Sequence, residues 1–202
     1  MKNFVCLVIS FFISISLFAQ DVPMNEKTKA VFDNILSRKS VRNYKTDSKG
    51  ERITISEDTL RAIVRAGMAA PCAMNRQPWE FVVLSGKKEM NIFAEKMPKL
   101  RMLKSAGAAI IVLGNPEVSK LWYEDCSAAA QNILLAIEAM GLGGVWTGGY
   151  PLEDRVAAIK EALDLPDPYL PLCVIPLGYP AGGEKAKDKW KSEKLHFNKF
   201  NK

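Results

Sequence analysis

Apolar residues recur at helical spacing in two segments of the first third of the chain. The first segment begins after Asn25, and the second begins at Ser56-Glu57-Asp58, which is typical of a helix start. The pattern predicts two amphipathic helices, with apolar positions Val31, Ile35 and Leu36 in the first and Leu60, Ile63, Val64 and Met68 in the second.

Four short apolar runs predict β-strands near residues 81–84, 108–113, 144–146 and 172–177. A longer helix is predicted over residues 119–140, ended by Gly141. Its second half, residues 128–140, is apolar on nearly every face, so it must be buried all round. A single small domain has few elements that could cover every face of this helix. We therefore expect part of the helix to pack against a second subunit, with Ala128–Ala130 permitting close approach.

The first 20 residues form a separate segment. Lys2 precedes an apolar run from Phe4 to Phe18, and Ala19-Gln20 follows. This order predicts a secretory signal peptide over residues 1–20, with cleavage after Ala19 or Gln20 left open. The alternative is an uncleaved anchor, but about 15 apolar residues fall short of the ~20 needed to span a bilayer. We expect export, to a periplasm-like compartment, with no stable membrane span after cleavage.

Composition indicates one globular enzyme-sized domain over residues 25–202. The chain has 202 residues, 48% of them hydrophobic, which suits one core better than two. Its net charge is +6, but the basic residues are mixed with 22 acidic ones, and no zinc or RNA-binding motif appears. We therefore expect an anionic cofactor and not nucleic acid. The tail from Gly182 is polar, with large apolar residues predicted to dock at Trp190, Leu195, Phe197 and Phe200.

Side chains that perform chemistry without a cofactor are scarce. His196 is the only histidine, so no histidine-based nucleophilic pair or metal site is indicated. Cys72, Cys126 and Cys173 follow the signal peptide without C-x-x-C spacing, so neither a disulfide framework nor a metal site is expected. For Cys72 a redox role and simple packing both stay open. An enzyme of this composition depends on a cofactor for its chemistry.

Two cationic clusters lie at opposite ends of the domain. One is Ser37-Arg38-Lys39-Ser40-Val41-Arg42, and the other contains Lys187 and Lys189. Guanidinium, ammonium and hydroxyl groups at this density are typical of a phosphate clamp. The alternative is a solvated helix end.

Two turns between the clusters offer groups suited to a flat heterocycle. Asn75 and Gln77 precede Pro78-Trp79, and each carboxamide provides a donor and an acceptor in one plane. Further on, Thr147-Gly148-Gly149 offers backbone that a ring can approach closely. Taken alone, the Asn75–Trp79 segment is better interpreted as an ordinary turn, and the Gly148-Gly149 pair is also typical of a strand end.

The ordered set of these motifs resembles the FMN-dependent nitroreductase family, from about Asn25 to the C-terminus. The resemblance implies an α+β fold with a mixed sheet flanked by helices, and a homodimer with FMN at the subunit interface. It also implies roles in cofactor binding. Arg38, Lys39, Ser40, Lys187 and Lys189 form the phosphate clamp, Arg42 faces flavin N1/O2, Asn75 and Gln77 contact the ribityl chain and ring edge, and the Thr147, Gly148 and Gly149 backbone lies near N5.

The activity implied is ping-pong hydride transfer from NAD(P)H to flavin N5 and then to a nitroaromatic, quinone or similar acceptor. No side-chain acid or base is needed for hydride transfer, and Arg42 would stabilise charge on the reduced ring. Three alternatives remain: a reductive dehalogenase, for which residues 85–107 make a short lid, a flavin-fragmenting relative, and a flavin carrier without turnover.

Overall fold

The computed structural model describes residues 24–200. The predicted signal peptide, residues 1–20, lies outside the described residues. Within the described part, no helix combines the length and the apolar character needed to cross a bilayer.

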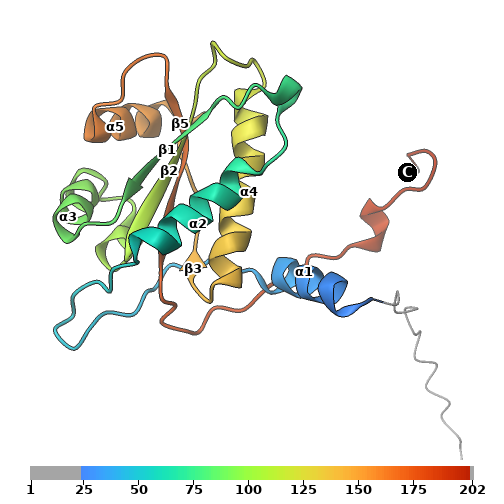
Figure 1. The fold of residues 1–202 in the computed structure, drawn as a ribbon, viewed down its shortest axis with the longest axis horizontal. Helices are drawn as coiled ribbons and strands as arrows, with labels where there is room; N and C mark the ends of the chain where they lie inside the picture. The colour runs from blue at the N-terminus through green and yellow to red at the C-terminus, as the bar shows by residue number, and fades with distance from the viewer. Residues whose placement is uncertain (1–23, 201–202) are drawn as a thin grey trace, which may run out of the picture.

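A five-stranded sheet forms the centre of the domain (Figure 1). Its strands are β1 (Trp79–Leu84), β2 (Ala108–Gly114), β3 (Gly143–Gly144), β4 (Thr147–Gly148) and β5 (Leu170–Gly178). They lie in the order β1-β2-β5-β3, and β4 also pairs with β5. The predicted α+β class is confirmed. All these strand pairs are antiparallel, and the parallel component among the described residues is an isolated bridge between Ser40 and Gly144.

The strand predicted at 144–146 is interrupted instead of continuous. Both β3 and β4 pair with β5 in one register, which places Val145 opposite Pro176. Val145 donates its N–H to the Pro176 carbonyl at 3.3 Å, but proline has no N–H to return. The break therefore originates in the facing strand.

Helices cover both faces of the sheet. Because successive strand residues point to opposite faces, Ala108, Ile110 and Val112 of β2 pack with α2 (Glu57–Met68) and α4 (Trp122–Ala139). The residues between them face the layer of α3 (Lys87–Lys96) and α5 (Glu153–Leu163). All seven residues of β2 are buried, so this strand is covered on both sides.

The close crossing of α2 and α4 corrects one sequence-based expectation. At Gly67 of α2 an added Cβ would lie 2.7 Å from Cγ1 of Ile133, so the two helices approach very closely. Ala129 and Ala130 of α4 have 0% exposure within their own chain. The expectation that Ala128–Ala130 faces a second subunit is therefore wrong for those two residues, because α2 and the sheet already enclose them; Ala128 is partly buried.

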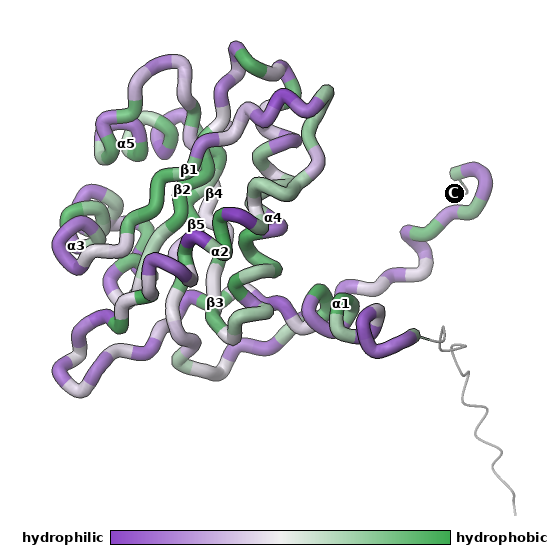
Figure 2. The backbone as a smooth tube through the Cα atoms, in the orientation of Figure 1, coloured by the Kyte–Doolittle hydropathy of each residue, from purple (hydrophilic) through white to green (hydrophobic). Residues whose placement is uncertain are grey.

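Two segments extend away from the core. Helix α1 (Glu26–Ser37) has no buried residue, although its side chains include Val31, Phe32, Ile35 and Leu36. The tail, residues 182–200, runs outward beyond α1 (Figures 1 and 2). Its apolar side chains, Trp190, Leu195, Phe197 and Phe200, are all exposed. Within residues 24–200, these apolar side chains are not packed into the core.

Candidate functional site

A cationic pocket of about 380 Å³ brings together the two basic clusters. One side comes from the segment that follows α1 and the other from the start of the tail. The lining residues are Arg38, Lys39, Ser40, Arg42, Glu184, Lys185, Lys187 and Lys189. The fold thus unites segments almost 150 residues apart into one concave, strongly positive surface. Such a surface attracts a phosphate group.

Specific contacts hold the 38–44 segment beside β3. The Val41 N–H donates to the Gly144 carbonyl at 3.0 Å, and the buried Tyr44 hydroxyl lies 2.8 Å from the carbonyls of Val41 and Pro176. An added Cβ at Gly143 would lie 2.6 Å from the Val41 side chain, so glycine permits this approach. Burial, followed by the nearby Glu184 carboxylate, raises the pKa of Tyr44, which keeps its hydroxyl protonated as a donor.

Two carboxylates are bonded to residues of the cationic pocket. The Nζ of Lys39 lies 2.9 Å from Oε1 of Glu138 at the end of α4, in a partly buried ion pair. Glu184 also enters the pocket, and its carboxylate accepts a hydrogen bond from the Arg42 N–H at 3.4 Å. The positive charge of Lys39 is therefore partly offset within the chain.

The edge formed by β3 and β4 presents the Thr147–Gly149 backbone. The Val145 and Gly149 N–H groups both donate to β5, so the alternation of an antiparallel ladder turns the backbone groups of Gly148 away from β5. On that outer side, Nη1 of Arg155 donates to the Gly148 carbonyl at 3.1 Å. An added Cβ at Gly148 meets nothing within 4 Å. The edge therefore has room for a ligand beside an outward amide.

At Gly149 the backbone packing is much tighter. An added Cβ there would lie 2.4 Å from the Pro171 carbonyl oxygen. Thr147 supports the same turn, because its hydroxyl donates to the Val174 carbonyl at 2.6 Å. Glycine at 149 is thus required by close backbone approach.

The carboxamide loop, residues 72–77, has an unusual backbone. Met74, Asn75 and Gln77 have φ values of 52°, 54° and 48°. For residues with a Cβ, the left-handed region costs roughly 1–2 kcal/mol each, and such strain clusters at functional sites. The two carboxamides are already oriented, because Nε2 of Gln77 donates to Oδ1 of Asn75 at 3.1 Å.

The carboxamide loop and the cationic pocket lie at opposite ends of α4. The loop is bonded to Asp125 in the first turn of α4, and Lys39 is bonded to Glu138 near its end. Thirteen helical residues span about 20 Å. One chain therefore places the β3–β4 edge next to the cationic pocket, but it does not bring Asn75 and Gln77 to that pocket.

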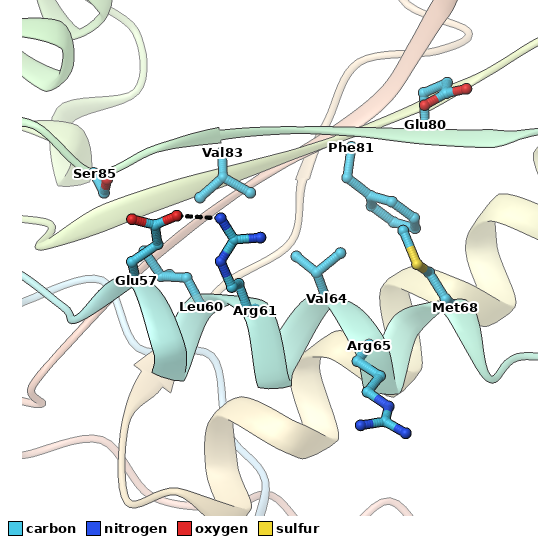
Figure 3. A pocket seen from close by; sticks show the side chains of 10 residues that line it. All are labelled: Glu57, Leu60, Arg61, Val64, Arg65, Met68, Glu80, Phe81, Val83 and Ser85. Carbon is cyan, nitrogen blue, oxygen red and sulfur yellow. Dashed lines mark hydrogen bonds and ion pairs between the residues drawn. The ribbon is translucent and has the colours of Figure 1, made fainter.

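A larger groove of about 640 Å³ lies between α2 and the edge strand β1. Figure 3 shows Phe81 and Val83 of β1 pointing toward Val64 and Met68 of α2, with the Glu57–Arg61 ion pair beside them. None of the site residues predicted from the sequence lines this groove. Five of its ten lining residues are apolar and the other five are polar or charged.

Sequence reasoning missed three residues that support the site. Glu138 pairs with Lys39, Arg155 holds the Gly148 carbonyl, and Asp125 holds the carboxamide loop. Glu124 and Asp125 form an acidic pair at the head of an apolar helix, which is a detectable sequence signal, but the sequence does not show which of the two is buried. The partners of Arg155 and Glu138 depend on tertiary contacts alone. For the thiols, burial was correctly predicted at Cys126 and Cys173, and Cys72 is partly buried.

Comparison with known proteins identifies the family. The model of the Nitroreductase family matches residues 35–120 and 93–179. A candidate NADH dehydrogenase/NAD(P)H nitroreductase of Methanothermobacter thermautotrophicus is 38% identical over 173 residues, which cover 84% of this chain and 87% of that protein.

Solved structures agree with this assignment. A candidate NADH dehydrogenase/NAD(P)H nitroreductase from Bacteroides thetaiotaomicron is 47% identical with a TM-score of 0.77, over 85% of this chain and 98% of its own. An FMN-dependent nitroreductase from Clostridium difficile is 29% identical with a TM-score of 0.74, over 84% and 99%. The chain therefore belongs to the nitroreductase family.

Proposed function

We propose that this protein is an FMN-dependent oxidoreductase that passes electrons from NAD(P)H to a nitroaromatic, quinone or similar acceptor. The observation that carries the proposal is the cationic pocket, where Arg38, Ser40 and Lys187 gather next to the β3–β4 edge. Relatives named for NAD(P)H and for FMN support the same donor and cofactor. Bound FMN would supply hydride acceptance and donation at its N5 atom.

The residues present are chemically suited to FMN. A phosphate group matches the arginine and lysine side chains of the cationic pocket, and Arg38 offers a bidentate fork. A flat ring suits the β3–β4 edge, where Gly148 leaves open space and its N–H points outward. Arg42, on the same segment as the clamp, provides a cation for the negative charge that reduction places at N1/O2.

This chain supplies positioning and electrostatics, and no described side chain has to serve as acid or base in the hydride step. One open site then serves donor and acceptor in turn, which predicts ping-pong kinetics.

A homodimer with FMN at the subunit interface belongs to the same proposal. Helix α1 exposes Val31, Phe32, Ile35 and Leu36, and the tail exposes four more large apolar side chains. The ribityl chain is joined directly to the phosphate, so a group that contacts it must lie within a few ångströms of the cationic pocket. The carboxamide loop of the same chain is about 20 Å away along α4. A second copy can supply this loop.

Export to the periplasm is proposed from the apolar run before Ala19. Sequencing the N-terminus of protein recovered from a periplasmic fraction tests it. Protein found with Met1 intact in the cytoplasm contradicts export and leaves the enzymatic proposal untouched.

The enzymatic proposal is tested on purified protein. We expect a yellow protein that releases FMN on denaturation, and steady NADH or NADPH oxidation with menadione or a nitroaromatic compound. Protein that stays colourless after incubation with FMN contradicts the cofactor assignment. Protein that binds FMN but oxidises neither NADH nor NADPH would be a flavin carrier.

Complementation between subunits tests the shared site. Arg38→Ala and Asn75→Ala each impair both sites of a homodimer. In a mixed dimer, a shared site places both changes in one site and leaves the other intact, so about half of the FMN content returns. If each chain builds its own site, both sites of the mixed dimer keep one defect and FMN content stays low.

A further inference from the structure

Asp125 is a nearly buried carboxylate outside the expected cofactor contacts. It lies in the first turn of α4 with only 6% of its surface exposed. Its Oδ1 accepts a hydrogen bond from the Ala73 N–H at 2.8 Å, and its Oδ2 accepts one from the Ser119 hydroxyl at 3.1 Å. A buried carboxylate is costly unless its oxygens are bonded, and here both are used.

The segment that Asp125 holds is the strained carboxamide loop. Backbone in the left-handed region persists at non-glycine residues only when the surroundings determine it. The side chains of Met74, Asn75 and Gln77 are exposed, so packing of these three side chains does not supply that restraint. Within the loop, the Gln77 N–H donates to Sγ of Cys72 at 3.3 Å, which closes the loop on itself. The polar contact from Asp125 enters at the beginning of the loop, and a bond between the Asn115 N–H and the Pro78 carbonyl, 2.8 Å, fixes its end.

Capping of α4 does not account for this arrangement. The hydroxyl oxygen of Ser119 accepts a hydrogen bond from the Leu121 N–H at the helix start, at 3.2 Å. Oδ1 of Asp125 instead binds a segment 52 residues away in sequence. The carboxylate thus connects the central helix of the core to a surface loop.

We infer that Asp125 is a positioning residue for flavin binding: its carboxylate holds the carboxamide loop in the conformation that presents Asn75 and Gln77 to the ribityl chain and ring. Asp125 itself does not touch the flavin. The inference rests on the proposed function, which assigns FMN to this site. It assigns a role to a residue that neither the motifs nor the clamp indicated.

Riboflavin has the ring and ribityl chain of FMN but lacks the phosphate. Comparing the two affinities therefore separates effects on contacts to the ring end from effects on contacts to the phosphate. Asp125→Ala should weaken FMN and riboflavin by the same factor, roughly tenfold, as expected for one lost bond to a charged group. Arg38→Ala should weaken FMN alone. Ser119→Ala is the matched control, because it removes the bond to Oδ2 and leaves the Ala73 contact, so both affinities should stay within about twofold. Asp125→Asn keeps an acceptor oxygen and should restore most of the binding.

Ala73→Pro removes the same hydrogen bond from its other partner, and because the proline ring occupies the place of the N–H hydrogen, the Asp125 carboxylate must also turn away from the loop. Proline lacks the N–H and suits the first residue of the short 3-10 helix at 73–75. The preceding Cys72 is already extended, with φ −146° and ψ 155°, as a residue before proline requires. We expect Ala73→Pro to reproduce the effect of Asp125→Ala. The double variant should bind like either single variant, because both remove one interaction.

The outcomes distinguish this inference from the proposed function. Wild-type protein that does not bind FMN refutes the proposed function. Normal FMN binding in both Asp125→Ala and Ala73→Pro overturns the positioning role alone, as do strictly additive losses in the double variant. A loss confined to FMN, with riboflavin unaffected, also overturns it. If Asp125→Ala does not fold, Ala73→Pro and Asp125→Asn still give the decisive comparison.

Discussion

The Nζ of Lys39 lies 2.9 Å from Oε1 of Glu138, so one lysine of the cationic pocket is paired with a carboxylate of α4. This pair joins the opening segment of the domain to the end of its central helix. One cation of the pocket, Lys39, is thus partly offset by a carboxylate of the same chain, whereas no ion pair of Arg38, Arg42, Lys187 or Lys189 is seen among the described residues.

We therefore expect Arg38→Ala and Lys39→Met to differ. Arg38→Ala should weaken FMN by roughly 1.5–3 kcal/mol, as for a lost charge-assisted bond, and barely affect riboflavin. Lys39→Met should cost FMN binding less than about threefold and lower thermal stability, because Glu138 is left partly buried without its partner. Isothermal titration with both flavins measures this. Equal FMN losses in the two variants would show that Lys39 leaves Glu138 for the phosphate.

Arg42→Gln should make bound flavin harder to reduce. The anionic reduced ring loses a nearby cation, whereas the neutral oxidised ring loses less, so the midpoint potential falls and reduction by NAD(P)H slows at saturating FMN. Arg42→Lys should be milder because it keeps the charge. Redox titration of FMN-saturated variants measures the potential. An unchanged potential in Arg42→Gln places this arginine away from N1/O2.

Deletion of the chain after Gly183 should lower both flavin content and dimer stability. The deletion removes Lys187 and Lys189 from the cationic pocket together with the exposed apolar groups of the tail. Sedimentation and flavin absorbance report the two effects. Lys187→Ala combined with Lys189→Ala is the matched control, which should lower flavin content and leave the dimer intact. A truncated protein that remains a fully flavinated dimer contradicts the role of the tail.

Gly148→Ala and Gly149→Ala form a matched pair on the β3–β4 edge. Alanine at 149 meets the Pro171 carbonyl oxygen at 2.4 Å, so the turn must shift, at roughly 1–3 kcal/mol of stability, and flavin binding falls with it. Alanine at 148 has open space around its Cβ, and its thermal stability should match the wild type. Thermal unfolding with and without FMN checks both. Equal destabilisation by the two changes contradicts the described packing.

The free energy of unfolding should decline in alkaline solution, because two buried thiols and a buried tyrosine hydroxyl stay protonated in the folded state. Burial, followed by the charge of Asp125, raises the pKa of Cys126 from 9.0 to about 12, and burial also raises the pKa values of Cys173 and Tyr44. The folded state then binds more protons than the unfolded chain, so the free energy of unfolding falls as pH rises from 9.0 toward 12. Urea unfolding across this range measures the slope. Cys126→Ala should flatten it, and an identical slope would show that this thiol does not contribute.

The sequence by itself determined the local elements and predicted a phosphate clamp. Ser56 and the spacing of Leu60 and Ile63 were sufficient for α2, because helix capping and the 3.6-residue repeat are local properties. The density of cations around Arg38 similarly indicated a phosphate site, since charge type needs no fold to be recognised.

Only the tertiary structure decided the long-range relationships. The break between β3 and β4 depends on Pro176 in a facing strand, and the burial of Ala129 depends on how closely α2 crosses α4. The loop with the strained backbone at Asn75 is hydrogen-bonded at its beginning to Asp125, a residue 50 positions away in sequence. Local patterns cannot specify such features, because the energies that fix them arise between segments that meet only after folding.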